Sequence, residues 1–438
     1  MTVQERSNLS KRPIRLVNLQ EPISLGPFRV DLAATRLLRN GAELQLRPRA
    51  FRALSVLIQN QGRLIDYKQM IREAWDGIQV SHHTITVTIA EIKDVLGEYG
   101  GWITCRPKFG YCLEVPGSEE LIRLGWHYWN QYTRHGFENA LRCFEQAAEL
   151  DGADFRAFQA ISSTHLMLAG FLMRAPRDTH GPFLRSHARA VELCGLTPDL
   201  RMDRAFGLCV FERDFAEAER ELLTVEPERP QSALLYVRLA LTYLASGRIE
   251  EARTLMQRAQ AADALSPELA FLGTIVRLFS REFQAAVEWG KNTLDLHPSS
   301  QVGRAFYAEA LDFAGHSEEA LAQYRLATTL SPDIGWIRAD QGRCLALHGC
   351  VAEAISVLDG LCRNREIEYV DCYHLALLLN ALGKRDEAFE ELERAYGEKS
   401  YALAFAGLDP KADGLRSDRR FSVFSPQLSG VARQGSAR

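Results

Sequence analysis

A 34-residue period runs through the C-terminal part of the chain and limits what this part can fold into. Six segments of similar charge and size pattern each end in an alanine, and consecutive alanines are 34 residues apart. These alanines are Ala218, Ala252, Ala286, Ala320, Ala354 and Ala388. A period of this length is typical of a stack of helical hairpins, in which each unit packs mainly on its neighbours.

Other positions of the unit recur with the same spacing. They are small residues on either side of the alanine and a closing proline, namely Ala240, Ala308, Gly342, Ala376, Ala259, Ala327, Ala395, Pro267, Pro298 and Pro332. Small side chains let two antiparallel helices pack closely, and proline cannot continue a helix. The pattern therefore predicts paired helices and disfavours an irregular bundle.

This signature resembles the tetratricopeptide repeat, which implies an all-α superhelix. We place about eight units over residues 118–400. The segment 173–181 is expected to insert about nine residues into a degenerate second repeat, where the register slips. The period stops after residue 400, and we interpret 401–438 as a capping segment and a flexible tail, because a stacked array must cover its last apolar face.

Arrays of this family usually hold an extended peptide or a partner helix in their concave groove, so a protein or peptide ligand is expected here. Candidate groove residues on the first helix of each pair are Tyr243, Arg277, Asp312 and Arg343. The alternative for each is a plain solvated position. No catalytic spacing occurs in the array, and its histidines are interpreted as surface or packing residues.

The first part of the chain predicts a small antiparallel sheet followed by three helices. Residues 1–20 are expected to be a flexible arm. The expected strands are 28–31, 35–40 and 43–46, with Asn40 and Gly41 as a hairpin turn. Pro48 opens the first helix, and Asp66 and Ser81 are expected to cap the second and third. Their apolar stripes predict the core residues Phe51, Leu54, Leu57, Ile58, Met70, Ile71, Ala74, Ile85, Ile89, Ile92 and Leu96.

The third helix leaves one face free for a groove. At about 15 residues it spans some 22 Å, which suits insertion into a DNA major groove. Two strands follow, joined by a tight turn at 107–110 with Arg106 and Lys108 at its tip. A basic hairpin tip beside a groove helix fits a phosphate clamp or a minor-groove probe.

The strands before the helices, the helix order and the final hairpin ending in Gly110 and Tyr111 resemble the OmpR/PhoB-type winged helix, an α+β fold. We place this domain at residues 21–117. With repeats behind it and no phosphoacceptor domain in front, the chain is similar to HilA- and CadC-like one-component regulators. The resemblance implies that the loop 76–80 contacts RNA polymerase.

The resemblance also implies which residues face DNA. They are His83, Thr84, Val87, Thr88, Glu91, Lys93, Arg106, Lys108 and Tyr111. One departure is that the family commonly has arginines late in this helix, where the chain has Ala90, Glu91 and Asp94. Acidic groups facing phosphates weaken binding and make it strongly salt dependent. Glu91 either accepts a hydrogen bond from cytosine N4 or is an exposed residue without a role.

Charge is divided unevenly between the two parts. The net charge is −4 overall, but residues 1–117 carry 16 Lys and Arg against 11 Asp and Glu, while the remainder carries 36 against 45. A basic head on an acidic body indicates that only the head meets a polyanion.

Several function classes are disfavoured by the sequence. No apolar run approaches the ~18 residues of a membrane span and no secretory signal is present, so a cytoplasmic protein is expected. The nine cysteines lack metal-ligand spacing, and Cys105 and Cys112 are expected to face each other, either as a redox pair or as structural thiols. Because no phosphate loop, metal cluster or nucleophile motif is found, we expect neither enzymatic activity nor a cofactor.

Two function hypotheses remain. The first is a transcription regulator that binds double-stranded promoter DNA and whose array binds a protein or ligand. Because two weak DNA-binding domains gain affinity when linked, we also predict a homodimer. The alternative is an interaction scaffold with a degenerate winged helix that does not bind DNA, which the acidic residues of the third helix support.

Overall fold

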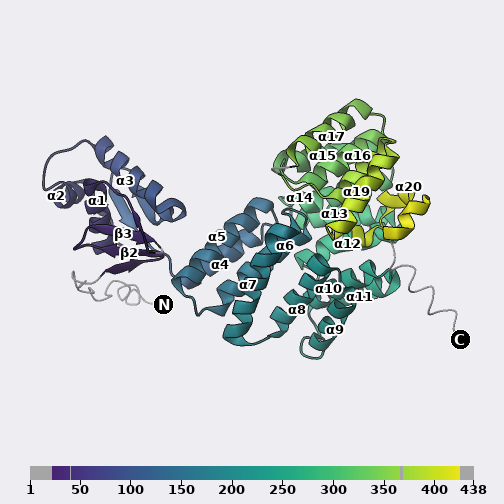
Figure 1. The fold of residues 1–438 in the computed structure, drawn as a ribbon, viewed down its shortest axis with the longest axis horizontal. Coiled ribbons are helices and arrows are strands. Elements are labelled where there is room, and N and C mark those ends of the chain that lie inside the picture. The colour runs from purple at the N-terminus through teal and green to yellow at the C-terminus, as the bar shows by residue number, and fades with distance from the viewer. Residues whose placement is uncertain (1–21, 40, 366–367, 425–438) are drawn as a thin grey trace, which may run out of the picture. The chain divides into compact units, whose positions relative to one another are not determined.

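The computed structural model describes residues 22–39, 41–365 and 368–424. The flexible arm expected at 1–20 and the tail from residue 425 lie outside the described residues. The chain divides into two compact units, one up to Leu121 together with Glu149–Asp151, and one with Ile122–Ala148 and the residues from Gly152 onward (Figure 1). Each unit is described by itself.

The first unit opens with a four-stranded antiparallel sheet in the order β1-β2-β3-β4. Its strands are β1 (Ile23–Leu25), β2 (Phe28–Asp31), β3 (Arg36–Arg39) and β4 (Ala42–Leu44). Strand β1 was not predicted, because three residues are too few to show alternation. Arg39 pairs with Ala42, as a two-residue turn requires, although Asn40, expected in that turn, lies outside the described residues.

Three helices cover this sheet: α1 (Pro48–Gln59), α2 (Tyr67–Ala74) and α3 (His82–Leu96). Both predicted caps are confirmed. The Asp66 carboxylate accepts from the backbone N–H of Gln69 at 2.7 Å, and the Ser81 hydroxyl accepts from the N–H of Thr84 at 3.2 Å. All the predicted core residues of the three helices are buried. The apolar stripe of α3 therefore faces inward and leaves its other side to solvent.

A second sheet joins the helices to the final hairpin, in the order β5-β7-β6. Its strands are β5 (Ile65–Asp66), β6 (Ile103–Arg106) and β7 (Gly110–Leu113), with the 3-10 helix η1 (Gly97–Trp102) before β6. Gly110 has a φ of 148°, and a Cβ on it would lie 2.0 Å from the carbonyl oxygen of Ile65. Glycine is therefore required where β7 passes β5.

The expectation that Cys105 and Cys112 face each other is wrong by one residue. In the β6–β7 register Cys105 pairs with Tyr111, and Cys112 pairs with Thr104. Cys105 is exposed and Cys112 is buried, because neighbouring positions of a strand point to opposite faces. The hairpin does not hold them as a redox pair.

The second unit is a run of consecutive helix pairs. From α4 to α19 they form eight hairpins in the described residues (Figure 1). The helices are α4 (Ser118–Trp129), α5 (Arg134–Leu150), α6 (Phe155–Gly170), α7 (Pro176–Cys194), α8 (Pro198–Gly207), α9 (Phe215–Val225), α10 (Ala233–Ala245), α11 (Ile249–Ala262), α12 (Pro267–Phe279), α13 (Phe283–Leu296), α14 (Gln301–Phe313), α15 (Ser317–Leu330), α16 (Gly335–Leu347), α17 (Val351–Asn364), α18 (Cys372–Ala381) and α19 (Arg385–Gly397).

The 34-residue period reflects close helix packing. All six register alanines, from Ala218 to Ala388, are 0% exposed. The segment 173–181 does not form an inserted loop: it supplies the turn after α6 and the first turns of α7, which is 19 residues long. The register slips there because α6 and α7, with 16 and 19 residues, are longer than the helices of the regular units, such as α10 and α11 with 13 and 14.

After α19 the chain forms short helices that cover the last hairpin. These are η3 (Ala402–Phe405), η4 (Pro410–Ala412), α20 (Asp413–Arg416) and η5 (Arg419–Phe424). Leu403, Leu415 and Phe421 share one apolar core with residues of α18 and α19. The exposed apolar face that every stacked array leaves at its end is buried in this way.

Candidate nucleic-acid interface and repeat-array cavity

The solvent face of α3 carries several of the residues expected to contact DNA. His83, Thr84 and Val87 are exposed, with Val87 44% accessible, and Lys93 is half-buried. Thr88 is only 6% exposed, and its hydroxyl donates to the carbonyl of Thr84 at 2.9 Å. Thr88 therefore serves the interior of the domain, because Ile85 and Ile89 turn its side of the helix toward the core.

Glu91 is neither an unpaired acid nor a fully exposed residue. Its carboxylate accepts from Arg47 Nε at 2.6 Å, from another guanidinium N–H of Arg47, and from the Arg47 backbone N–H at 3.1 Å. The side-chain hydrogen bond to Arg47 lowers the pKa of Glu91. The pair compensates the charge of Glu91, while Asp94, the other acid in this part of α3, is exposed.

The tip of the β6–β7 hairpin carries the exposed cations Arg106 and Lys108. Between them and Gly110, Phe109 is 65% exposed. Sequence reasoning missed Phe109, although an apolar ring in a basic turn is a recognisable signal for a groove probe. Lys108 has a φ of 70°, so the turn holds a defined, left-handed conformation at this position.

Tyr111 lies under the interface. It is 4% exposed, its hydroxyl is 3.3 Å from the Thr86 hydroxyl on α3, and its ring meets the edge of Tyr67 at 5.9 Å between centroids. Tyr67 in turn stacks on His82 at 4.1 Å. These contacts position the hairpin and the start of α3, and burial raises the pKa of Tyr111.

The loop 76–80 is held at its first residue. Asp76 accepts hydrogen bonds from Arg49 and Arg52 of α1, at 3.1 and 2.6 Å, and these bonds lower its pKa. Ile78 in the middle of the loop is 59% exposed. An exposed apolar residue on an anchored loop is available for a protein contact.

The four expected groove residues lie in local contacts. The Arg248 guanidinium lies 3.7 Å from the Tyr243 ring centre, and that of Arg277 lies 3.9 Å from the Trp289 ring centre. Arg343 is 4% exposed and donates to Asp312 at 2.5 Å. None of the four lines the cavity described below.

The structure also brings Asp312, Cys344 and His348 together, although they belong to two different repeats. One possible ligand atom from each lies within 4.8 Å of the others, a geometry that could hold a metal ion. Both Asp312 oxygens already accept hydrogen bonds, one from Arg343 and one shared with His348 Nε2 at 2.6 Å. The cluster is thus satisfied by its own side chains.

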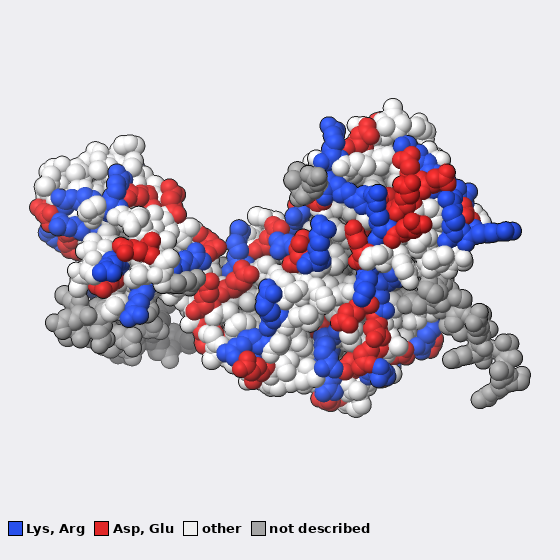
Figure 2. Space-filling model, viewed as in Figure 1, with Lys and Arg blue, Asp and Glu red and all other residues white. Residues whose placement is uncertain are grey.

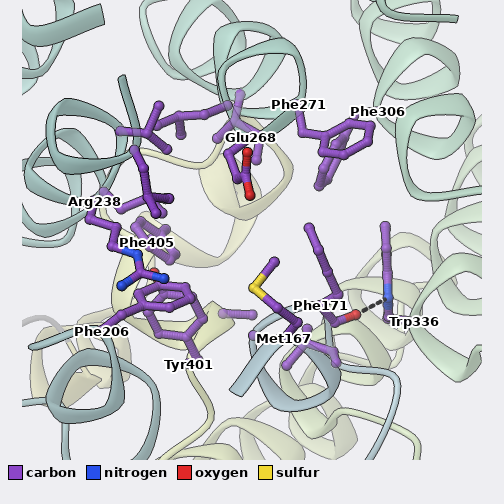
Figure 3. Close-up of a pocket in the computed structure, with 18 of the residues that line it drawn as sticks. Met167, Phe171, Phe206, Arg238, Glu268, Phe271, Phe306, Trp336, Tyr401 and Phe405 are labelled. Atoms are coloured by element: carbon purple, nitrogen blue, oxygen red, sulfur yellow. Dashed lines mark hydrogen bonds between the residues drawn. The ribbon is translucent and has the colours of Figure 1, made fainter. Parts of the chain in front are cut away.

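A cavity of about 360 Å³ lies inside the second unit, lined mostly by apolar and aromatic side chains (Figure 3). The first helices of successive hairpins line it with Arg238, Leu272, Phe306 and His374. These residues occupy one position of the 34-residue unit. The 34-residue period relates these lining residues to one another. It does not by itself show which side of the first helix faces inward.

Contacts between residues that are distant in the sequence hold the walls of the cavity together. The Trp336 indole N–H of α16 donates to the carbonyl of Phe171, after α6, at 2.9 Å (Figure 3). The Tyr132 hydroxyl donates to Glu268 of α12 at 2.8 Å. Lys411, from the segment after α19, donates to Glu309 at 3.1 Å and to Asp340 at 2.9 Å. The early repeats, later repeats and C-terminal segment of this unit thus meet around one space.

Charged side chains of both signs lie on the outside of the second unit. On the face shown in Figure 2, Lys and Arg are intermixed with Asp and Glu over the helices. The surplus of acidic residues in this part of the sequence is therefore not gathered into one field on that face.

Comparison with known proteins identifies the first unit. Residues 41–113 match the family described as Transcriptional regulatory protein, C terminal. The first unit is an OmpR/PhoB-type winged helix. The Transcriptional activator CadC of Escherichia coli strain K12 is 29% identical over 103 residues, which cover 22% of this chain and 20% of that protein. The Transcriptional regulatory protein KdpE of Mycobacterium tuberculosis strain H37Rv is 28% identical over 85 residues, which cover 19% of this chain and 38% of that protein.

The chain spans only about a fifth of the length of the first of these curated relatives and about two fifths of the second. Residues 233–264, the hairpin of α10 and α11, match the family Tetratricopeptide repeat. A human IFIT1 dimer solved with PPP-AAAA is 15% identical, with a TM-score of 0.50, and covers 80% of this chain and 79% of its own. A thermophilic TPR protein from Thermus thermophilus, TTC0263, is 20% identical, with a TM-score of 0.37, and the match covers 44% of this chain and 99% of that protein.

The second unit is a tetratricopeptide-repeat array. The predicted fold class, an α+β winged helix followed by an all-α repeat superhelix, is confirmed. Identities this low compare the fold alone. Among the helices that the structure describes, none has both the length and the apolar character needed to span a bilayer.

Proposed function

We propose that this chain is a sequence-specific DNA-binding transcription regulator, with α3 of the winged helix in the major groove of promoter DNA and the β6–β7 hairpin against the adjacent backbone. The observation that carries the proposal is the exposed face of α3 beside a hairpin tip that presents Arg106 and Lys108. Neither cation has an ion-pair partner in the described part of the chain, so both are available to phosphates.

The proposed contact set is the expected one without the buried residues Thr88 and Tyr111 and without Glu91. His83, Thr84 and Val87 face the bases, Lys93 reaches the backbone, and Arg106 and Lys108 hold the flanking phosphates. Thr88 and Tyr111 shape the domain from inside. Because Glu91 is bonded to Arg47, its carboxylate is oriented and partly neutralised, which favours a structural role over base reading.

The test is DNA binding by the full chain over a salt series. Fragments enriched from a genomic pool supply the target, and mobility shifts at rising salt give the number of phosphate contacts. Arg106→Ala with Lys108→Ala should weaken binding to all fragments and reduce the salt slope by about 2. Arg29→Ala, an exposed arginine of β2, is the matched control and should change neither.

Absence of binding to any fragment at low salt would refute this function and favour the interaction scaffold. The repeat array is proposed to bind a protein or ligand in either case, and to bring two copies together. The loop 76–80, with Ile78 exposed, is the proposed contact for RNA polymerase. Light scattering with and without DNA tests the dimer.

A further inference from the structure

The carboxylates that line the array cavity differ in whether a basic side chain pairs with them. Those with a basic partner are Asp199 with Arg229 at 3.3 Å, Asp203 with Arg238 at 2.8 Å, Glu309 with Lys411 at 3.1 Å and Asp409 with Lys411 at 4.0 Å. Glu268 is the exception, because it has no ion-pair partner among the residues that the structure describes. A half-buried carboxylate without a counter-ion leaves part of its charge unbalanced.

Both hydrogen-bond partners of Glu268 are neutral hydroxyls. Its Oε1 accepts from Tyr132 at 2.8 Å, and its Oε2 accepts from Ser266 at 3.2 Å. Burial raises the pKa of Tyr132, so this phenol stays a donor and does not add charge. The Glu268 side chain points into the open space of the cavity, with Phe271 above it and Met167 opposite (Figure 3).

Aromatic rings form the wall beside this carboxylate. Phe171 and Phe271 meet edge to face with centroids 6.0 Å apart, and Phe306 stacks on Trp336 at 5.6 Å. The faces of such rings carry negative charge density and attract ammonium groups. A carboxylate and several aromatic rings around one apolar space are the groups that recognise an organic cation.

The volume of the cavity limits the size of the occupant. The bond from Trp336 to Phe171 joins repeats on two sides, and Tyr401 and Phe405 enter the lining from the C-terminal segment. The space is partly open to solvent, so a small ligand can enter it. A volume of about 360 Å³ falls in the range of small-molecule pockets, about 300–1,000 Å³.

We propose that the repeat array binds a small organic cation, an ammonium group on an apolar body, with Glu268 as its counter-ion and the Phe171, Phe271, Phe306 and Trp336 rings around it. The proposal concerns the array alone and goes beyond DNA binding, since the ligand is measured without DNA. A negative result for cation binding therefore does not affect the proposed DNA binding, and the reverse also holds.

The test is calorimetric titration of the full chain with probes of matched shape and different charge. The first set is phenethylammonium, 2-phenylethanol and phenylacetate, and the second is hexylammonium, hexanol and hexanoate. The ammonium member should bind at least about tenfold more tightly than the alcohol and the carboxylate, because a charge-assisted hydrogen bond is worth at least that factor.

Glu268→Gln keeps the size of the side chain and an acceptor for Tyr132. It should weaken ammonium binding about tenfold or more and leave alcohol binding unchanged. Glu318→Gln, an exposed first-turn acid of α15, is the matched control for loss of a charge near a helix start and should bind like the parent. Ile275→Trp fills the cavity from α12 and should abolish binding of every probe.

Three outcomes would overturn the proposal. They are equal binding of the alcohol or acid, no binding of either ammonium probe up to about 10 mM, and Glu268→Gln binding like the parent while its thermal unfolding is unchanged. If Glu268→Gln unfolds, Ile275→Trp decides, because ammonium binding that survives in this variant places the ligand elsewhere.

Discussion

Arg47, at the start of α1, holds Glu91 on α3 with its guanidinium and its backbone N–H, the Nε lying 2.6 Å from the carboxylate. The two residues are 44 positions apart in the sequence. The pair ties the two helices and sets part of the charge that α3 presents to solvent, and to DNA under the proposed function. An acid that would repel phosphates is instead bonded to a cation.

The first prediction separates two roles of this ion pair, the link between α1 and α3 and the charge on α3. Arg47→Ala leaves Glu91 unpaired on the side of the domain proposed to face DNA, and binding to the enriched fragments should weaken roughly fivefold in Kd. Arg47→Ala combined with Glu91→Gln should recover most of that loss, because the uncompensated charge is gone. Equal Kd values for the single and double variants in mobility shifts would show that Glu91 lies away from the phosphates.

The second prediction concerns the hairpin. Gly110→Ala should destabilise the winged helix by at least about 2 kcal/mol, because the new Cβ would lie 2.0 Å from the Ile65 carbonyl oxygen and must push β5 from β7. Gly101→Ala is the control, since a Cβ there meets nothing within 4 Å. Urea unfolding followed by the winged-helix tryptophans measures both. Similar midpoints for the two variants would contradict the requirement for glycine.

Local features of this molecule could be read from the sequence, and distant pairings could not. Ala218 and its register partners recur at a fixed spacing, and the stripe from Ile85 to Leu96 repeats with the helical period, so the fold and the exposed face of α3 were predictable. The partner of Glu91 lies on another helix, and Trp336 meets Phe171 from 165 positions away. No spacing rule connects such residues, because only the packed chain brings them together.

The candidate sites divide in the same way. Arg106 and Lys108 lie in a turn that the sequence shows directly. The family resemblance places Thr88 on the DNA face, and only the packing reveals that its hydroxyl bonds back to Thr84. The cavity around Glu268 needed the curvature of the superhelix, which depends on small rotations between repeats that residue types do not encode simply.

The third prediction is a pH dependence from His165 on α6. The side chain is 5% exposed, and burial, aided by Arg174 and Arg185, lowers its pKa to about 4. The unfolded chain takes up this proton near the ordinary value of 6.5, before the folded chain does. The stability contribution is therefore complete above pH 6.5 and declines as the pH falls toward 4, with a loss of about 2 kcal/mol by pH 5.

His165→Leu removes the titrating group and keeps a similar volume, so its stability should change less between pH 7 and pH 5 than that of the parent. Urea midpoints of the array at the two pH values give the comparison. His135→Gln, at an exposed position of α5, should retain the parent's pH difference. If His165→Leu also retained it, the acid sensitivity would come from other groups.

The fourth prediction concerns the ion cluster that anchors the C-terminal segment. Lys411 is nearly buried and bonds to Glu309 and Asp340, whose side chains are 4% and 0% exposed. Removing one member of such a cluster leaves the others buried and uncompensated. Lys411→Met should therefore destabilise the array by about 3–5 kcal/mol.

The matched control is Lys291→Met on the exposed side of α13, for which a change below about 0.5 kcal/mol is expected. Combining Lys411→Met with Glu309→Gln should recover part of the loss, because one of the stranded charges is removed. Hydrogen exchange of the Lys411→Met variant then separates anchoring of the segment from stability of the whole array. If Lys411 holds the segment in place, the exchange rates of the amides of 402–412 should rise more than those of α10 and α11. Uniform exchange across the array would show that the cluster stabilises the fold without anchoring the segment.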